Sequence, residues 1–150
     1  MNKKKMSILA LIVATVILLL CFCNKDNTLH ADPGDMAEGA LTCIYGWRDI
    51  DMLMSLTPYE EGTEIYDIAS RYFLEMMDNP GWVSSYKEID SGDLKKTDKR
   101  AYEEMKYELE RYGVTGVKAM KRYTYQCDGF DDIAIYVAKI GRNWFTVMAE

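Results

Sequence analysis

VKAMKRYTYQCDGFDDIAIYVAKIGRNWFTVMA, residues 117–149, has the clearest strand pattern in this 150-residue chain. Apolar and polar side chains alternate over residues 117–127, which is typical of a strand with one buried face. Asp128-Gly129 is a strong hairpin signal, and Gly141-Arg142 marks a second turn. The sequence therefore predicts three antiparallel strands at residues 117–127, 133–140 and 144–149.

The second and third of these strands are apolar on both faces. In residues 133–140, isoleucine and valine alternate with alanine, tyrosine and isoleucine, and residues 144–149 set Trp144 and Met148 against Phe145 and Val147. If helices cover one face, the other face needs a curled sheet, a ligand or a second subunit to keep it from water.

The chain before residue 117 is predicted to be mostly helical. Asp35 to Glu38 matches a capping box that opens a first helix ending near Gly46, and Asp49 caps a short second helix through Leu56. Thr63 caps a third helix, which Asn79-Pro80-Gly81 stops. Its apolar residues recur at helical spacing: Ile65, Ile68, Ala69, Tyr72, Phe73 and Met76.

A short strand is expected at residues 82–89, followed by the longest helix at residues 94–112. The buried seam of that helix is predicted to contain Tyr102, Met105, Leu109 and Tyr112, and its other faces are charged. Helices first and antiparallel strands last predict an α+β domain.

The N-terminus has the pattern of a membrane-directed segment. Lys3 to Lys5 precede an uncharged apolar run from Met6 to Cys23, which as a helix would be about 27 Å long, near the lower limit for a membrane span. The lysines place this end in the cytoplasm and everything after Cys23 outside it. Three outcomes remain open: an uncleaved anchor, a lipid attached to Cys21 or Cys23, or cleavage after Ala31. The bulky Leu20 and Phe22 favour the anchor over the lipid.

These features divide the chain into a signal peptide or transmembrane anchor (1–23), a polar tether (24–34) and an exported domain (35–150). From Asp32 onward the chain has 14 basic and 23 acidic side chains, a balance of −9, against −6 for the whole. This charge argues against nucleic acid as a partner and against peripheral binding to anionic lipid. We expect the protein at the cell membrane, bacterial in type, with its domain outside the cytoplasm.

Cys43 and Cys127 are the two cysteines of the exported domain, and two hypotheses about them remain open. They can form a disulfide in an oxidising compartment, closing a loop of about 85 residues worth about 4–5 kcal/mol in the chain-entropy model. Alternatively, each is a small buried apolar side chain.

The sequence provides no catalytic or metal-binding motif. The one histidine, His30, falls in the tether, so the exported domain lacks an imidazole for acid–base chemistry. The aspartates around the hairpin match no calcium loop. We therefore predict no catalytic residues, no metal and no cofactor. Aromatic residues that could line an interior pocket are Tyr102, Tyr123, Tyr125, Tyr136 and Trp144, although each is also explained as a half-buried aromatic.

Two stretches resemble the nuclear transport factor 2-like, cystatin-like cone superfamily, in particular its small bacterial envelope and lipoprotein members of unknown function. AEGALTCIYGWRDIDMLMSL, residues 37–56, is similar to the opening helices of that fold, and YVAKIGRNWFTVM, residues 136–148, is similar to its closing hairpin. The resemblance covers most of residues 36–149. It implies helices packed on a curved sheet, a pocket in the cone and dimers through the open face of the sheet, and it implies no particular chemistry.

We therefore expect a membrane-tethered, extracytoplasmic binding or accessory domain without catalysis. Its expected partners are the membrane, through the N-terminus, and a second copy or an envelope protein, through the sheet face. One alternative is a small enzyme of the isomerase or dehydratase type that uses an Asp–Tyr pair in the cone. The other is an envelope inhibitor or immunity protein that acts through its acidic surface.

Overall fold

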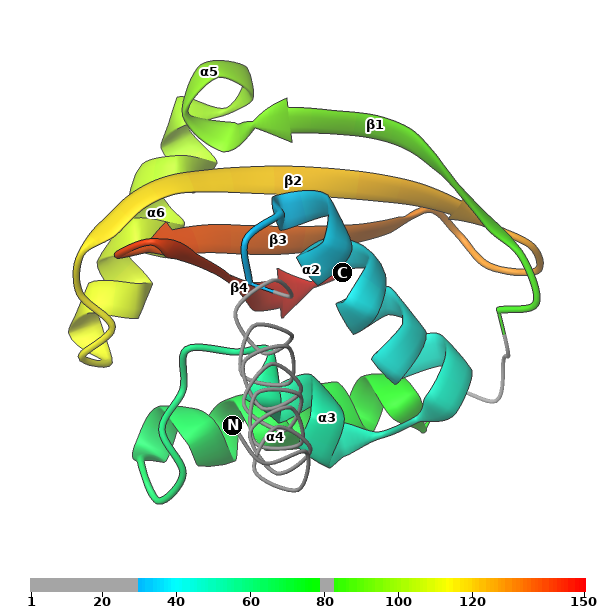
Figure 1. The fold of residues 1–150 in the computed structure, drawn as a ribbon, viewed down its shortest axis with the longest axis horizontal. Coiled ribbons are helices and arrows are strands. Elements are labelled where there is room, and N and C mark those ends of the chain that lie inside the picture. Colours follow the sequence, from blue (N-terminus) through cyan, green and yellow to red (C-terminus); the bar gives the residue numbers. More distant parts are fainter. Residues whose placement is uncertain (1–29, 79–82) are drawn as a thin grey trace, which may run out of the picture.

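The computed structural model describes residues 30–78 and 83–150, which form an α+β domain (Figure 1). The elements in chain order are α2 (Pro33–Leu41), η1 (Thr42–Trp47), α3 (Ile50–Ser55), α4 (Glu64–Met77), β1 (Tyr86–Asp93), α5 (Leu94–Thr97), α6 (Lys99–Arg111), β2 (Val117–Cys127), β3 (Ile133–Ile140) and β4 (Asn143–Ala149). The predicted α+β class and the three closing strands are confirmed.

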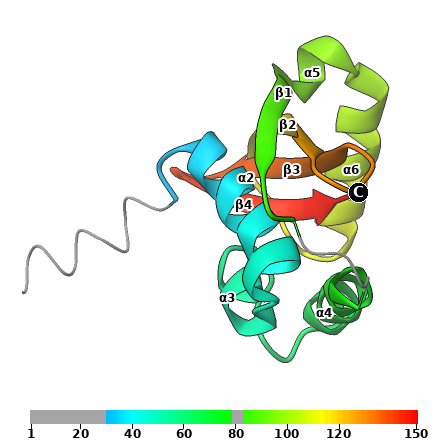
Figure 2. The ribbon, with the colours of Figure 1, turned by 90° about the vertical axis from the view of Figure 1, so that its right-hand side faces the viewer.

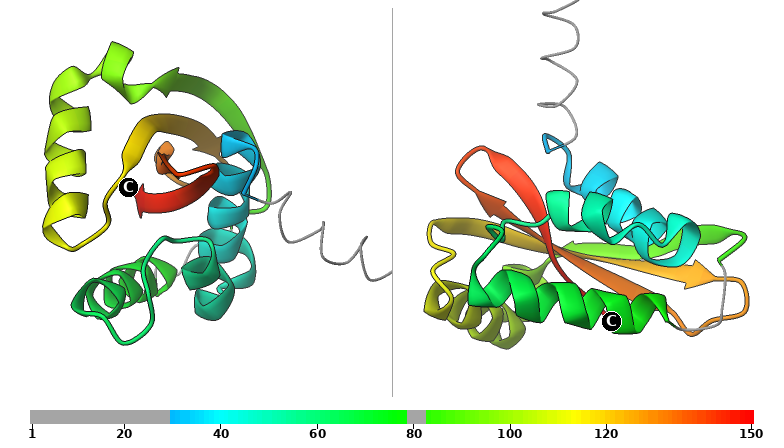
Figure 3. Two further views of the ribbon diagram at one scale, coloured as in Figure 1. Left: turned by 60° about the vertical axis from the view of Figure 1, so that its left-hand side comes forward. Right: turned by 90° about the horizontal axis from the view of Figure 1, so that it is seen from below.

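The four strands form one antiparallel sheet in the order β1-β2-β3-β4. The β2–β3 hairpin turns at Asp128-Gly129, where Gly129 has a φ of 85° that favours glycine. Register shifts interrupt each pair of strands, for example between Tyr136 and Val137 on β3. Such bulges increase local twist, and the sheet is visibly curved (Figure 3).

β1 lies four residues later than the sequence predicts. It runs from Tyr86 to Asp93 because it pairs with β2 from Tyr86–Cys127 to Asp93–Lys121. This pairing carries Ser91 and Gly92 into the sheet, although neither residue favours strands. The prediction of a strand at residues 82–89 is therefore wrong in its bounds, since local sequence does not contain the partner that sets the register.

The first helix also begins earlier than predicted. Its N-cap is Asp32, whose Oδ1 accepts hydrogen bonds from the backbone N–H of Gly34 at 2.7 Å and of Asp35 at 3.2 Å. Pro33 then occupies the first turn, where its missing N–H costs nothing. The capping box at Asp35 is therefore wrong. The helix continues past Gly46 as the π-helix η1 and ends at Arg48, whose φ is 53°.

The predicted helix at residues 94–112 is divided in two. Asp98 leaves the helical conformation (φ −149°, ψ 84°) and caps α6 by accepting a hydrogen bond from the Ala101 N–H at 3.0 Å. The short helix α5 precedes this break. The cap fixes where α6 starts, and so which of its side chains face the sheet.

Helices lie on both faces of the sheet (Figure 2). On one face, α2 packs close: the Thr146 hydroxyl donates to the Met36 carbonyl at 3.3 Å, and Tyr123 lies beside Gly34. The helices α4 and α6 lie apart from each other on the other face (Figure 3). β3, one of the two central strands, is buried from Ile133 to Ala138, so the prediction that both of its faces avoid water is confirmed.

His30 lies against β4, although the sequence places it in the tether. Its carbonyl accepts a hydrogen bond from the Trp144 N–H at 2.8 Å, and its ring centroid is 5.0 Å from that of Phe145. Among residues 30–78 and 83–150, no helix has the length and apolar character that a membrane crossing requires. The predicted anchor at residues 1–23, with Cys21 and Cys23, lies outside the described residues.

Candidate functional site

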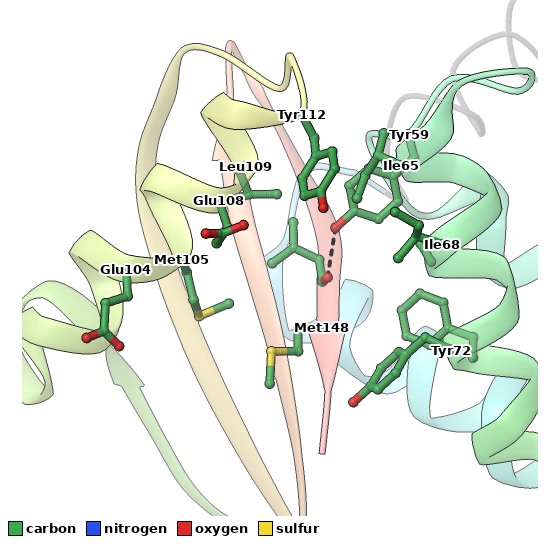
Figure 4. Close-up of a pocket in the computed structure, with 13 residues that line it drawn as sticks. Tyr59, Ile65, Ile68, Tyr72, Glu104, Met105, Glu108, Leu109, Tyr112 and Met148 are labelled. Carbon is green, nitrogen blue, oxygen red and sulfur yellow. Dashed lines mark hydrogen bonds between the residues drawn. The ribbon is translucent and has the colours of Figure 1, made fainter.

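An apolar pocket of about 430 Å³ opens between α4 and α6, with β4 as its floor (Figure 4). We call it the α4–α6 pocket. Its lining residues are Tyr59, Ile65, Ile68, Ala69, Tyr72, Phe73, Glu104, Met105, Glu108, Leu109, Tyr112, Val147 and Met148. A volume of this size and a lining this apolar are typical of small-molecule sites, which run from about 300 to 1,000 Å³.

The α4 wall is the apolar stripe that the sequence predicts for this helix. Thr63 caps the helix by accepting a hydrogen bond from the Tyr66 N–H at 3.3 Å. Five of the six stripe residues, all except Met76, then line the pocket. Phe73 is buried, whereas the Tyr72 side chain remains 39% exposed at the opening. The stripe therefore contributes buried residues such as Phe73 to the hydrophobic core and partly exposed residues such as Tyr72 to the open pocket.

The α6 wall contains three residues of the predicted seam: Met105, Leu109 and Tyr112. Leu109 is buried, and Met105 and Tyr112 are half-buried. Glu104 and Glu108 lie on the same side of the pocket, one helical turn apart (Figure 4). The two apolar helix faces thus lie opposite each other across the gap without closing it.

Two tyrosines attach the α4 side to β4. The Tyr59 hydroxyl donates to the Val147 carbonyl at 2.9 Å, and burial raises the pKa of Tyr59. The Tyr72 hydroxyl donates to the Ala149 carbonyl. β4 is an edge strand, so these bonds occupy carbonyls that no further strand pairs. They fix the position of β4, and with it the floor residues Val147 and Met148, relative to α4.

A polar network continues from the floor of the pocket across the sheet. Met148 is paired with Tyr136, and Tyr136 is paired with Arg122, so the three side chains share one face. The Tyr136 hydroxyl donates to Glu150, and Arg122 forms an ion pair with Asp90 at 3.1 Å. Burial, together with the hydrogen bond to Glu150, raises the pKa of Tyr136 to about 12.

None of the carboxylates in the described part of the chain is buried. Asp93 is half-buried and caps α5, and the other aspartates and glutamates of residues 30–78 and 83–150 are exposed. Glu104 and Glu108 at the pocket are ion-paired with Arg100 and Arg111. An Asp–Tyr pair of the isomerase type needs a carboxylate enclosed by apolar walls, and the pocket contains no aspartate.

The described residues also contain no group of three or more side chains arranged to hold a metal ion. The pocket lining offers two carboxylates and three phenols in place of histidine or cysteine ligands. It can therefore bind by apolar contact, by aromatic contact and by the negative charge of its rim.

The five aromatic residues predicted as pocket lining lie elsewhere. Tyr102 is buried beneath Lys95, whose ammonium is 5.7 Å from the ring centroid. Tyr123 and Tyr125 lie on the sheet face that α2 covers. Tyr136 belongs to the polar network, one strand from Met148.

Trp144, the fifth, is buried between two lysines. The ammonium groups of Lys121 and Lys139 are each 5.7 Å from its ring centroid. This arrangement lies on the α2 side of the sheet. Trp144 pairs with Lys139, which is on the same face as Val137, and Val137 pairs with Thr146, the residue that bonds to Met36 of α2. It is therefore separated by the sheet from the α4–α6 pocket.

Cys43 and Cys127 are both buried free thiols in the structure. Burial and the negative charge of Asp49 raise the pKa of Cys43 to about 11. Burial, with Asp132 and Asp128 nearby, raises the pKa of Cys127. The alternative of two small buried side chains describes this arrangement, and the disulfide stays a prediction for the oxidised protein.

The sequence pattern does not mark Tyr59, and it sets Val147 on the strand face opposite Met148, although both residues line the pocket. Tyr59 lies in the connection between α3 and α4, where no periodicity marks a buried side chain. Val147 sits at the irregular pairing between β3 and β4, where the register shifts after Tyr136. The predicted stripes of α4 and α6 contain most of the other lining residues. Helical spacing predicts that these residues are shielded from water, but it does not predict whether protein or a ligand shields them.

Comparison with known proteins adds no assignment. No family model matches the chain, and no curated protein and no solved structure matches it either.

Proposed function

We propose that this protein is a non-catalytic binding domain that holds an apolar small molecule in the α4–α6 pocket. Its N-terminal segment tethers it to the membrane, and the domain faces outside the cytoplasm. The observation that supports this most is the pocket itself, about 430 Å³ with an almost entirely apolar lining. An apolar surface of this kind, left open to water, is favourably covered by an apolar ligand.

The cone-like architecture of the nuclear transport factor 2-like superfamily is part of this proposal. The curvature of the antiparallel sheet supports it (Figure 3). Partner binding through the part of the sheet that the helices leave open is a further part of it, because β1 is an edge strand with exposed residues from Tyr86 to Ser91.

The enzyme alternative has less support. It requires a buried acid beside a tyrosine, and the charged residues that line the pocket are the exposed Glu104 and Glu108. The inhibitor or immunity alternative draws its support from the acidic surface and would be addressed by capture from native membranes.

The binding test uses residues 30–150, because the hydrophobic core formed by the described residues runs from Met36 to Ala149 and is retained whole. Cooperative thermal unfolding, followed by circular dichroism, first checks that this chain folds. Decanol is then titrated, and saturable binding is measured by calorimetry. We expect binding in the micromolar range, about −7 to −8 kcal/mol, as for a ligand of this size in an apolar cavity.

Two variants of α6 form a matched pair. Met105→Trp fills the pocket from its wall and should abolish decanol binding. Tyr107→Trp places the same side chain two residues away, where Tyr107 is 66% exposed, and should leave binding unchanged. A folded protein that binds no decanol, or that binds it equally in both variants, contradicts the proposal.

A further inference from the structure

We infer that the α4–α6 pocket selects amphipathic organic cations, with the apolar body of the ligand in the pocket and its positive group at the α6 rim. This inference rests on the proposed function, because it names the class of ligand for the same pocket. The observation behind it is the charge of the lining: its acidic residues are Glu104 and Glu108, and the described residues that line it include no lysine, arginine or histidine.

The two rim carboxylates are open to a ligand. Glu104 pairs with Arg100 at 2.7 Å, and Glu108 with Arg111 at 3.4 Å, but all four side chains are more than half exposed. Exposed pairs of this kind are worth less than about 1 kcal/mol. Neither arginine lines the pocket, so a cation that approaches from within the pocket can compete for the same carboxylates.

The α4 side of the opening also favours a cation. Tyr72 lies there and is 39% exposed as a residue, and the negative face of an aromatic ring attracts a positive group. The charge of Glu150 lies close enough to add to burial in raising the pKa of Tyr72. A cationic group in the opening would thus lie between glutamates on one side and an aromatic ring with a nearby carboxylate on the other.

An anionic head group would find no complementary charge among the lining residues. Arg122 is two strands away from Met148, about 10 Å across the sheet, and is already paired with Asp90. Arg111 lies over the ring of Tyr112, 5.5 Å from its centroid, and is engaged with Glu108. The excess of 9 acidic over basic side chains from Asp32 onward further favours cations at long range.

The test compares three probes with the same ten-carbon chain: decyltrimethylammonium, decanol and decanoate, each kept below its micelle concentration at pH 8 and low salt. Each is titrated into residues 30–150 by calorimetry. We expect decyltrimethylammonium to bind about three- to tenfold more tightly than decanol, and decanoate to bind more weakly than decanol, as one or two exposed charge contacts allow.

Matched variants assign the preference to the rim. Glu104→Gln with Glu108→Gln should bring the affinity for decyltrimethylammonium down to the affinity that the same double variant has for decanol. Glu103→Gln with Glu110→Gln removes the same charge from the same helix, at exposed positions outside the pocket lining, and should preserve most of the preference.

The outcomes separate the two proposals. If decanol binds but decyltrimethylammonium binds no better, or if both double variants lose the preference equally, the inference about cations is wrong and the proposed function stands. If no probe binds the folded protein, the proposed function itself is wrong.

Discussion

Tyr59 shows at the residue scale how a single side chain fixes the position of the pocket. It is buried, it comes from the connection before α4, and its hydroxyl donates to the carbonyl of Val147 on β4. Buried polar groups that lose their partner cost about 1–3 kcal/mol. The bond therefore links the α4 side of the pocket to its floor.

We predict that Tyr59→Phe lowers the free energy of unfolding by about 1–2 kcal/mol, because it leaves the Val147 carbonyl without its donor. Urea unfolding followed by circular dichroism measures this change. Tyr107→Phe is the control, since Tyr107 is exposed, and it should change stability by less than about 0.5 kcal/mol. Equal effects of the two changes would show that the Tyr59 bond contributes nothing.

Cys43 gives a second prediction at this scale. Its pKa of about 11 means that roughly one thiol in a thousand is ionised at pH 8, and the thiolate is the form that reacts. Iodoacetamide should therefore modify Cys43 of the native protein at least about tenfold more slowly than in urea, as followed by peptide mass spectrometry. Equal rates would contradict its burial. Modification in urea only after reduction would instead demonstrate the predicted disulfide.

At the scale of elements, the sequence predicts amphipathic helices well and their ends less well. The stripes of α4 and α6 are where the spacing places them, because helical periodicity is a local property. The start of α2 at Asp32 and the break at Asp98 were missed, although aspartate is a favoured cap at both positions. Competing caps lie within a few residues in each case, and tertiary packing selects between them.

The N-cap of α6, Asp98, can be tested by substitution. Asp98→Ala removes the side chain that accepts from the Ala101 N–H and should cost about 0.5–2 kcal/mol of stability. Because α6 forms one wall of the pocket, decanol affinity should fall as well. The control is Asp131→Ala in the exposed hairpin, for which both quantities should stay constant. If α6 keeps its stability and the pocket its affinity without Asp98, the cap does not position this helix.

At the scale of the whole molecule, the fold class was predictable and the pocket was not. The alternation of apolar and polar residues, the hairpin signals and the order of the elements are sufficient to predict an α+β domain that ends in an antiparallel meander. The pocket depends on the distance between α4 and α6, and the local sequence pattern of each helix does not contain that distance. Among the aromatic residues predicted to line a pocket, Tyr123, Tyr125 and Trp144 lie on the α2 side of the sheet because strand register decides their side. Tyr136 lies on the same face as Met148 but one strand away from it.

The tyrosines also predict how the whole domain responds to alkaline pH. The pKa of Tyr136 is raised to about 12 in the folded protein, above the ordinary value of 10.0. Between these values the unfolded chain releases its proton first, so this contribution is complete below pH 10 and is lost as pH rises toward 12. Urea unfolding from pH 8 to 11.5 should show falling stability above pH 10, and Tyr136→Phe should reduce that slope. A stability independent of pH across this range would contradict the raised pKa.

The most direct test of ligand binding in the α4–α6 pocket is methyl NMR of the protein with labelled methionines. Met105 lies on the α6 wall of the pocket and Met148 on its floor, whereas Met52 is 38% exposed on α3 and outside the lining. On addition of decanol, the methyl signals of Met105 and Met148 should shift together and saturate, while that of Met52 stays in place. If neither pocket methionine shifts, or if Met52 shifts as much as they do, the pocket is not the binding site.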